Sequence, residues 1–221
     1  MENPRVSHTR LICWAALVAA VSALEYSARF SGTAAKSNRN EVYSFSAFGS
    51  GVVFYAFILG LVLAIAYDRV DLLALRRPAA HAAALAAALL VSIYAWELVV
   101  SVLPIRNPGK EQGLTPTHWE PSHAGAFAAN VVLFTVIAPA VEELTFRGVG
   151  QSLLRFTGRW PSILLVGVAF GVWHGLVQAL LVLIPFGIGL AYLRDRTRSV
   201  LPGMVVHGLF NGAALALAVL S

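Results

Sequence analysis

The chain has 221 residues, of which 58% are hydrophobic and 12% are charged. A soluble domain carries about 25% charged residues to cover its surface, so this composition excludes most soluble folds. We expect a single membrane domain over residues 1–221. The formal net charge is +5, but the basic residues stand singly between apolar runs, so the sequence does not predict a nucleic-acid partner. The single cysteine, Cys13, excludes an internal disulfide.

The first half of the chain contains three apolar runs. Residues 11–24 follow Arg5 and Arg10, a pattern typical of a signal peptide as well as of a first membrane helix. Because a multispanning protein usually keeps its first helix as an anchor, we expect this helix to be retained. Residues 48–67 and 79–103 are each long enough to cross about 30 Å of hydrocarbon as one helix.

The second half contains three more runs. Residues 124–144 and 200–220 are each long enough for one crossing. Residues 160–193 would extend about 51 Å as a single helix, which is too long for the bilayer. We therefore expect two helices there, with a break between Gly175 and Pro185. The sequence predicts an all-α, polytopic membrane helix bundle of about seven transmembrane helices.

The positions of the basic residues predict the orientation of this bundle. With seven helices, ten Lys and Arg residues lie on one side of the membrane and five on the other. If residues 160–193 formed one helix, the count would become seven against eight and the asymmetry would disappear. By the positive-inside rule we expect a cytoplasmic N-terminus and a C-terminus outside.

Several polar side chains lie inside the apolar runs, where an unpaired ionisable group is costly. They are Glu97, Glu142, Glu143, Arg147, His174, His207 and Asn211. Glu143 and Arg147 are four residues apart, in the order that lets a carboxylate meet a guanidinium across one helical turn. Glu142 points about 100° away from that pair. The sequence leaves open a role for Glu97 and for the Pro- and Gly-rich loop 104–123.

Distance from the turns predicts that these side chains converge. We expect the helix that carries Glu142 to continue to about Phe156, so Glu142 and His174 each lie 16 residues from Gly158. The helical rise then places both at one depth, about 24 Å from the turn. His207 and Asn211, four residues apart on the last helix, lie at a similar depth. The sequence therefore predicts a polar pocket within the bilayer.

This set of side chains supports amide hydrolysis. A carboxylate beside a histidine can take a proton from water and deliver it to a leaving amine, while an imidazole and an amide can stabilise an oxyanion. Two histidines and a carboxylate can also bind Zn²⁺ with an open position. The H-E-x-x-H spacing of familiar zinc proteases is absent, but the residues alone leave both alternatives open.

The motifs resemble those of a known family. They are Glu142-Glu143-x-x-x-Arg147, Phe170-x-x-x-His174 and His207-x-x-x-Asn211. In this order they are similar to the signatures of the CAAX-type prenyl endopeptidase and bacteriocin-processing (CPBP) intramembrane proteases. The resemblance covers residues 124–220, the expected catalytic core, whereas residues 1–123 carry no such motif and are expected to be additional helices.

The resemblance implies roles for the catalytic residues. Glu142 would be the water-activating base, with His174 beside it. His207 and Asn211 would stabilise the oxyanion. Bacterial members of the family are described as glutamic-type proteases and, in older accounts, as metalloproteases. We therefore expect a peptide-bond hydrolase that needs no cofactor, with a zinc-dependent version as the alternative.

The resemblance also implies supporting residues and a class of substrate. Glu143 with Arg147 would support the site, and Phe170 would pack one turn before His174. Small size and richness in Ala and Arg indicate a bacterial cell-membrane protein, so we expect a membrane-anchored protein or peptide cut near a C-terminal anchor or sorting signal. Rival functions are a non-catalytic bacteriocin-immunity or scaffold protein and a proton-coupled transporter.

Overall fold

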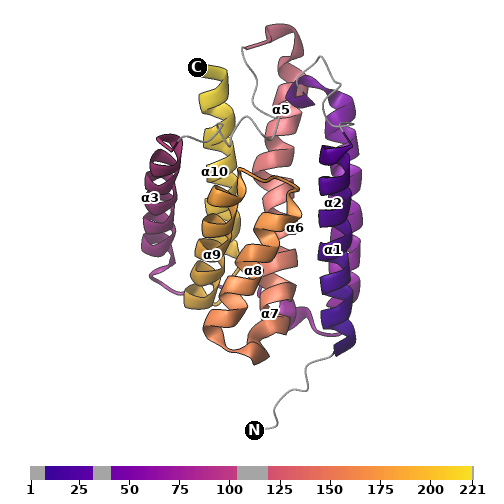
Figure 1. Cartoon of the computed structure of the whole chain (residues 1–221), viewed down its shortest axis with the longest axis vertical. Coiled ribbons are helices and arrows are strands. Elements are labelled where there is room, and N and C mark those ends of the chain that lie inside the picture. Colours follow the sequence, from indigo (N-terminus) through magenta and orange to yellow (C-terminus); the bar gives the residue numbers. More distant parts are fainter. Residues whose placement is uncertain (1–7, 32–40, 104–118, 221) are drawn as a thin grey trace.

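The computed structural model describes residues 8–31, 41–103 and 119–220, and every regular element within them is a helix. The predicted all-α bundle is thus confirmed, with the seven expected helices side by side in these residues (Figure 1). They are α1 (His8–Phe30), α2 (Phe45–Ile65), α3 (Ala82–Ser101), a long helix over Pro121–Thr157, α8 (Arg159–Trp173), α9 (Leu180–Thr197) and α10 (Leu201–Leu220).

Four of these helices are long and apolar enough to cross a membrane by length and composition. They are α1, α2, α3 and the helix over Pro121–Thr157. The long helix has 37 residues and therefore extends about 55 Å, well beyond the hydrocarbon thickness. α1 and α2 form one edge of the bundle and α3 the other, with α3 packed on α9 and α10 (Figure 1).

The break predicted between Gly175 and Pro185 is present. α8 ends at Trp173 and α9 begins at Leu180. Gly175 lies in this turn with φ +64°, a conformation that glycine adopts without strain. A Cβ there would lie 2.6 Å from Glu25 Cβ, so the turn also needs glycine to approach α1.

Pro185 lies inside α9 because another helix compensates for it. Proline has no backbone N–H, so the carbonyl of Leu181, four residues earlier, loses its helical donor. The Trp96 indole Nε1 of α3 donates to that oxygen at 2.6 Å. The Trp96 side chain thus replaces the hydrogen bond that the proline removes, and it joins α3 to α9.

The long helix contains two π-helical turns. Its parts are η4 (Pro121–His123), α5 (Ala124–Val132), η5 (Leu133–Ile137, π), α6 (Ala138–Glu143), η6 (Leu144–Gly150, π), α7 (Gln151–Leu154) and η7 (Arg155–Thr157). In η5 the Ala138 N–H donates to Leu133 O, five residues back. Pro139 would be the next donor in that pattern but lacks an N–H. The carbonyl of Phe134 accepts instead from Asn211 Nδ2 of α10, at 2.9 Å.

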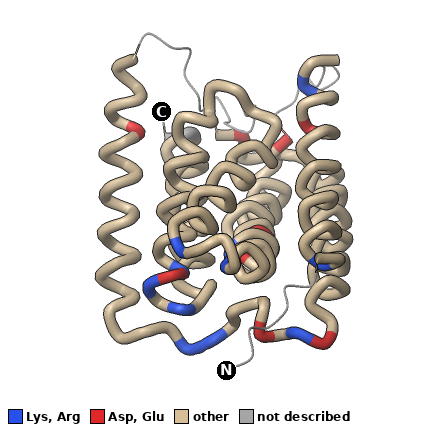
Figure 2. Tube along the Cα trace, turned by 60° about the horizontal axis from the view of Figure 1, so that its bottom comes forward, with Lys and Arg blue, Asp and Glu red and all other residues tan. Residues whose placement is uncertain are grey.

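The ends of several helices meet at one basic end of the molecule (Figure 2). Arg155 and Arg159 both bind the Asp195 carboxylate, each at 2.7 Å. This bridge joins the end of the long helix to the start of α8 and the end of α9. The end is the one that the sequence predicts to be cytoplasmic.

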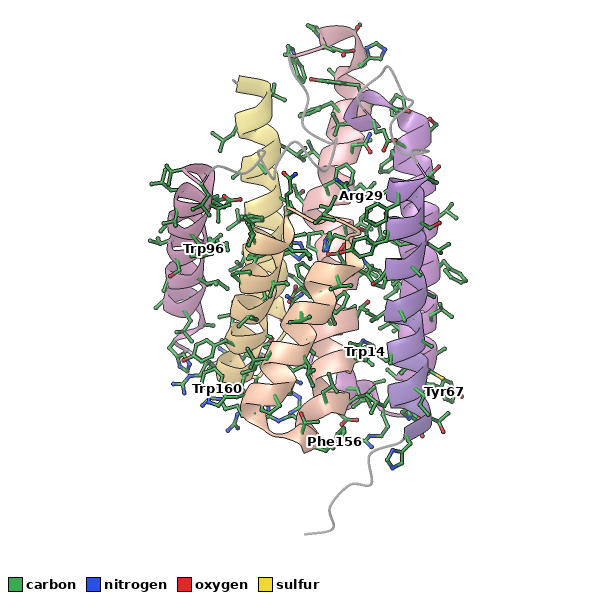
Figure 3. All side chains as sticks on the ribbon, viewed as in Figure 1. Trp14, Arg29, Tyr67, Trp96, Phe156 and Trp160 are labelled. Atoms are coloured by element: carbon green, nitrogen blue, oxygen red, sulfur yellow. The ribbon has the colours of Figure 1, made fainter. Side chains whose placement is uncertain are left out.

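The first helix packs into the bundle through Trp14. Its side chain faces the central helices (Figure 3) and is 5% exposed. The indole Nε1 donates to Thr145 O at 2.9 Å. The ring lies over Gly150, where a Cβ would come within 2.5 Å of it. α1 is therefore in close contact with the π turn η6, which begins immediately after Glu143.

We expect Trp14→Phe to lower the free energy of unfolding by about 1–3 kcal/mol, because Thr145 O loses its indole donor in a buried position. Thermal unfolding of the purified protein in detergent measures this change. Trp160→Phe is the matched control, since Trp160 is 55% exposed. Equal losses in the two variants would contradict a specific contribution from Trp14.

Candidate active site

The carboxylate of Glu142, on α6, lies where three other helices meet. Its Oε1 accepts a hydrogen bond from the Tyr55 hydroxyl of α2 at 2.8 Å. Its Oε2 is buried and has no hydrogen-bond partner among the described residues. His174 Nε2 lies 3.9 Å from Oε2, and His207 Nε2 lies 3.8 Å from it. The structure thus brings Glu142, His174 and His207 together at the depth that the turn distances predict.

His174 ends α8 with its ring held by the backbone. The last turn tightens so that the His174 N–H donates to Gly171 O, which leaves Phe170 O available. His174 Nδ1 lies 2.8 Å from Phe170 O. Because a carbonyl oxygen only accepts, Nδ1 carries the hydrogen. Nε2 is then the unprotonated nitrogen of the neutral ring, and it faces Glu142.

His207, on α10, is held in the same manner by a different group. Its Nδ1 lies 3.4 Å from Glu143 Oε1, and the ring is 3% exposed. Its other ring nitrogen, Nε2, faces Glu142, so the imidazole lies between two carboxylates. Both imidazoles therefore present their Nε2 atoms to the space beside Glu142 Oε2.

A fully buried ion pair supports the histidines. Arg147 Nη1 donates to Glu143 Oε1 at 2.9 Å, and both side chains are 0% exposed. Arg147 Nη2 also donates to Gly187 O of α9. The ring of Phe170 lies beneath the guanidinium, 4.2 Å from Arg147 Cζ, and contacts both imidazoles edge-on. The i,i+4 pair forms as its spacing predicts, and Phe170 packs at the centre of the cluster.

Asn211 lies one turn after His207, and its amide is partly engaged. One of its two N–H groups is used by the bond to Phe134 O, so one remains. α10 approaches η5 closely here, because a Cβ on Gly208 would lie 2.3 Å from Thr135 O. The close approach places Asn211 against the π turn.

Sequence reasoning missed Tyr55. A tyrosine in an apolar helix is common, and no motif links it to Glu142, which is 87 residues away. The sequence predicts that residues 1–123 form helices additional to the catalytic core. α2, one of these helices, supplies a direct partner of the Glu142 carboxylate. The available signal was weak: Tyr55 is a phenol in an otherwise apolar stretch.

A groove of 810 Å³ lies beside α2 and η5, and Tyr55 is one of its lining residues. Its lining is partly polar and consists of Glu41, Ser44, Ser46, Ala47, Ser50, Gly51, Phe54, Tyr55, Leu133 and Phe134. The partner of Glu142 is therefore also part of a groove wall.

The sequence left open a role for Glu97 and for the loop 104–123. Glu97 is on α3, at the edge of the bundle (Figure 1). In the loop 104–123, residues 104–118 lie outside the described residues. Trp119 and His123 pack against the ring of Tyr43.

The spacing of the donor atoms around Glu142 Oε2 is wider than in a tetrahedral zinc site. Tetrahedral Zn²⁺ with bonds of about 2.1 Å places its ligand atoms about 3.4 Å apart. Glu142 Oε2 is 3.8 and 3.9 Å from the two Nε2 atoms, which is wider. Among the residues that the structure describes, no group of three or more His, Cys, Asp or Glu side chains is arranged to hold a metal ion.

Comparison with known families tests the resemblance. Residues 124–213 match the model of the type II CAAX prenyl endopeptidase Rce1-like family. This segment is similar to an Rce1-like domain. It extends from α5 into α10 and contains Glu142, His174, His207 and Asn211, and the family indicates a protease. No curated protein and no solved structure matches the chain. Tyr55 lies outside the Rce1-like domain.

We expect Arg147→Met to destabilise the protein by about 3–5 kcal/mol, because it leaves the Glu143 carboxylate buried without its cation. Adding Glu143→Gln to that variant removes the uncompensated charge and should restore part of the loss. Thermal unfolding of the single and double variants measures both effects. A double variant no more stable than Arg147→Met would contradict the ion-pair explanation.

Proposed function

We propose that the protein is an intramembrane endopeptidase in which Glu142 activates water for attack on a peptide bond. The observation that carries this proposal is the unpartnered Glu142 Oε2 between the Nε2 atoms of His174 and His207. Other buried polar atoms of the described residues, Glu143 Oε2 among them, also have no hydrogen-bond partner. Glu142 Oε2 differs because two imidazole nitrogens face it, which favours a water or substrate at this oxygen. The Rce1-like domain around these residues supports protease chemistry.

The proposed reaction needs no group from outside the chain except water. Water beside Oε2 gives a proton to Glu142 as its oxygen attacks the substrate carbonyl carbon. His207 and the remaining amide N–H of Asn211 stabilise the oxyanion. The tetrahedral intermediate then breaks its C–N bond, and the proton passes from Glu142 to the leaving amine, with His174 as the adjacent proton carrier. The products are a carboxylic acid and an amine.

We propose a membrane-anchored protein or peptide as the substrate. The groove lined by Tyr55 offers space for an extended segment, and its serines can hydrogen-bond a peptide backbone. Glu41, which also lines the groove, is at the end of the bundle opposite the arginine-rich turns. With those arginines in the cytoplasm of a bacterial cell, the substrate would enter from the outer side of the membrane, near a C-terminal anchor or sorting signal.

Glu142→Gln should reduce cleavage of a membrane-anchored substrate at least 10³-fold, because the amide cannot accept a proton from water. Substrate cleavage in proteoliposomes, followed by mass spectrometry of the products, measures the effect. Glu97→Gln is the matched control, since it makes the same change on α3 and should leave cleavage within twofold of the wild type. Full cleavage by Glu142→Gln would refute the mechanism, and normal physiological function without cleavage would favour a scaffold or immunity protein.

A zinc-dependent version of the same hydrolysis makes a different prediction. The glutamic mechanism predicts full activity after prolonged treatment with a chelator and less than 0.1 mole of zinc per mole of active protein. The measurements are metal analysis of the purified protein and its cleavage rate before and after chelation. Loss of activity that zinc restores would establish the metalloprotease alternative.

A further inference from the structure

We propose that Tyr55 is a positioning residue, whose hydroxyl occupies Oε1 of Glu142 and so makes Oε2 the oxygen that meets water. The catalytic meaning of this inference rests on the proposed function. The contact itself does not, because the hydrogen bond of 2.8 Å is a property of the protein alone. Tyr55 lies outside residues 124–213, so the family match assigns it no role.

The face of α2 that carries Tyr55 is fixed by close packing. Gly51 precedes Tyr55 by one turn, and a Cβ there would lie 2.4 Å from Leu133 Cδ2. Ile58 and Val62, further along the same face, are 1% and 0% exposed. The glycine thus lets α2 approach η5, and the aliphatic residues hold the register. Together they bring the phenol within reach of Glu142.

The Tyr55 ring is also braced toward the end of α8. Phe54 packs edge-on against it, with the ring centroids 5.2 Å apart. Phe54 in turn lies 6.5 Å from the ring of Trp173, the residue before His174. α2 therefore contacts both Glu142, the proposed base, and the end of α8, where Trp173 precedes His174.

The hydrogen bond makes the two oxygens of Glu142 chemically different. Without a donor on Oε1, the carboxylate can rotate about its last side-chain bond and present either oxygen to water. With the phenol on Oε1, the plane of the group is fixed and Oε2 faces the two Nε2 atoms, at 3.9 and 3.8 Å. Fixing a reacting oxygen in this way lowers the barrier by orientation rather than by added chemistry.

A merely structural hydrogen bond would stabilise the protein without affecting turnover. Tyr55→Phe removes only the hydroxyl and keeps the ring that packs on Phe54. Tyr94→Phe is the matched control, because Tyr94 is a half-buried tyrosine of α3 that packs against Phe210. We expect Tyr55→Phe to lower kcat about tenfold with KM within twofold of the wild type, and Tyr94→Phe to leave both unchanged.

Turnover of the membrane-anchored substrate in proteoliposomes measures kcat and KM, and thermal unfolding of the same samples reports folding. A folded Tyr55→Phe protein with wild-type kcat would overturn the proposal. A rise in KM alone would also overturn it, because that result would make Tyr55 a substrate contact in the groove.

Infrared spectroscopy of the purified protein tests the contact without any substrate. The carboxyl bands that disappear in Glu142→Gln identify Glu142. Those bands should shift in Tyr55→Phe and stay in place in Tyr94→Phe. Unshifted bands would refute the inference even where the wild type is an active protease. If the bands shift but the wild type cleaves no substrate, the proposed function fails while the contact between Tyr55 and Glu142 stands.

Discussion

The arrangement of this site depends on one buried charge pair. Arg147 and Glu143 lie side by side with no exposed surface, where a lone charge would be strongly destabilising. Further contacts help to stabilise the pair: the guanidinium also binds the backbone of α9 and lies on the ring of Phe170, and the carboxylate also faces His207. Helices α8, α9 and α10 are thus arranged around a feature of the long helix.

Glu142 differs from its neighbour Glu143 in the group that binds it. Each carboxylate has one buried oxygen without a hydrogen-bond partner among the described residues, but Glu143 receives a charged guanidinium and Glu142 a neutral phenol. Two adjacent residues of one chemical type therefore have different environments, one suited to holding a structure and the other to reacting. The helical rotation of about 100° between them is enough to produce this division.

Much of this arrangement follows from counting along helices. Glu142 and His174 are equally far from Gly158, and Glu142 Oε2 lies 3.9 Å from His174 Nε2. Tyr55 could not be found in this way, because its place depends on how α2 packs rather than on any turn. Pro185, the later limit of the predicted break, lies inside α9, where the Trp96 indole binds the carbonyl that has lost its helical donor. Such compensation is a tertiary effect that no local pattern encodes.

Two prolines, Pro139 and Pro185, each leave a backbone oxygen that a side chain of another helix binds, from Asn211 and Trp96 respectively. In lipid, water and the hydrophobic effect do little to decide which helices pair. An oxygen without its helical donor is a strong and directional acceptor there, and it favours only a neighbour that carries a donor at the matching height. The two prolines therefore favour particular helix pairs. Pro139 favours packing of α10 on the long helix, and Pro185 favours packing of α3 on α9.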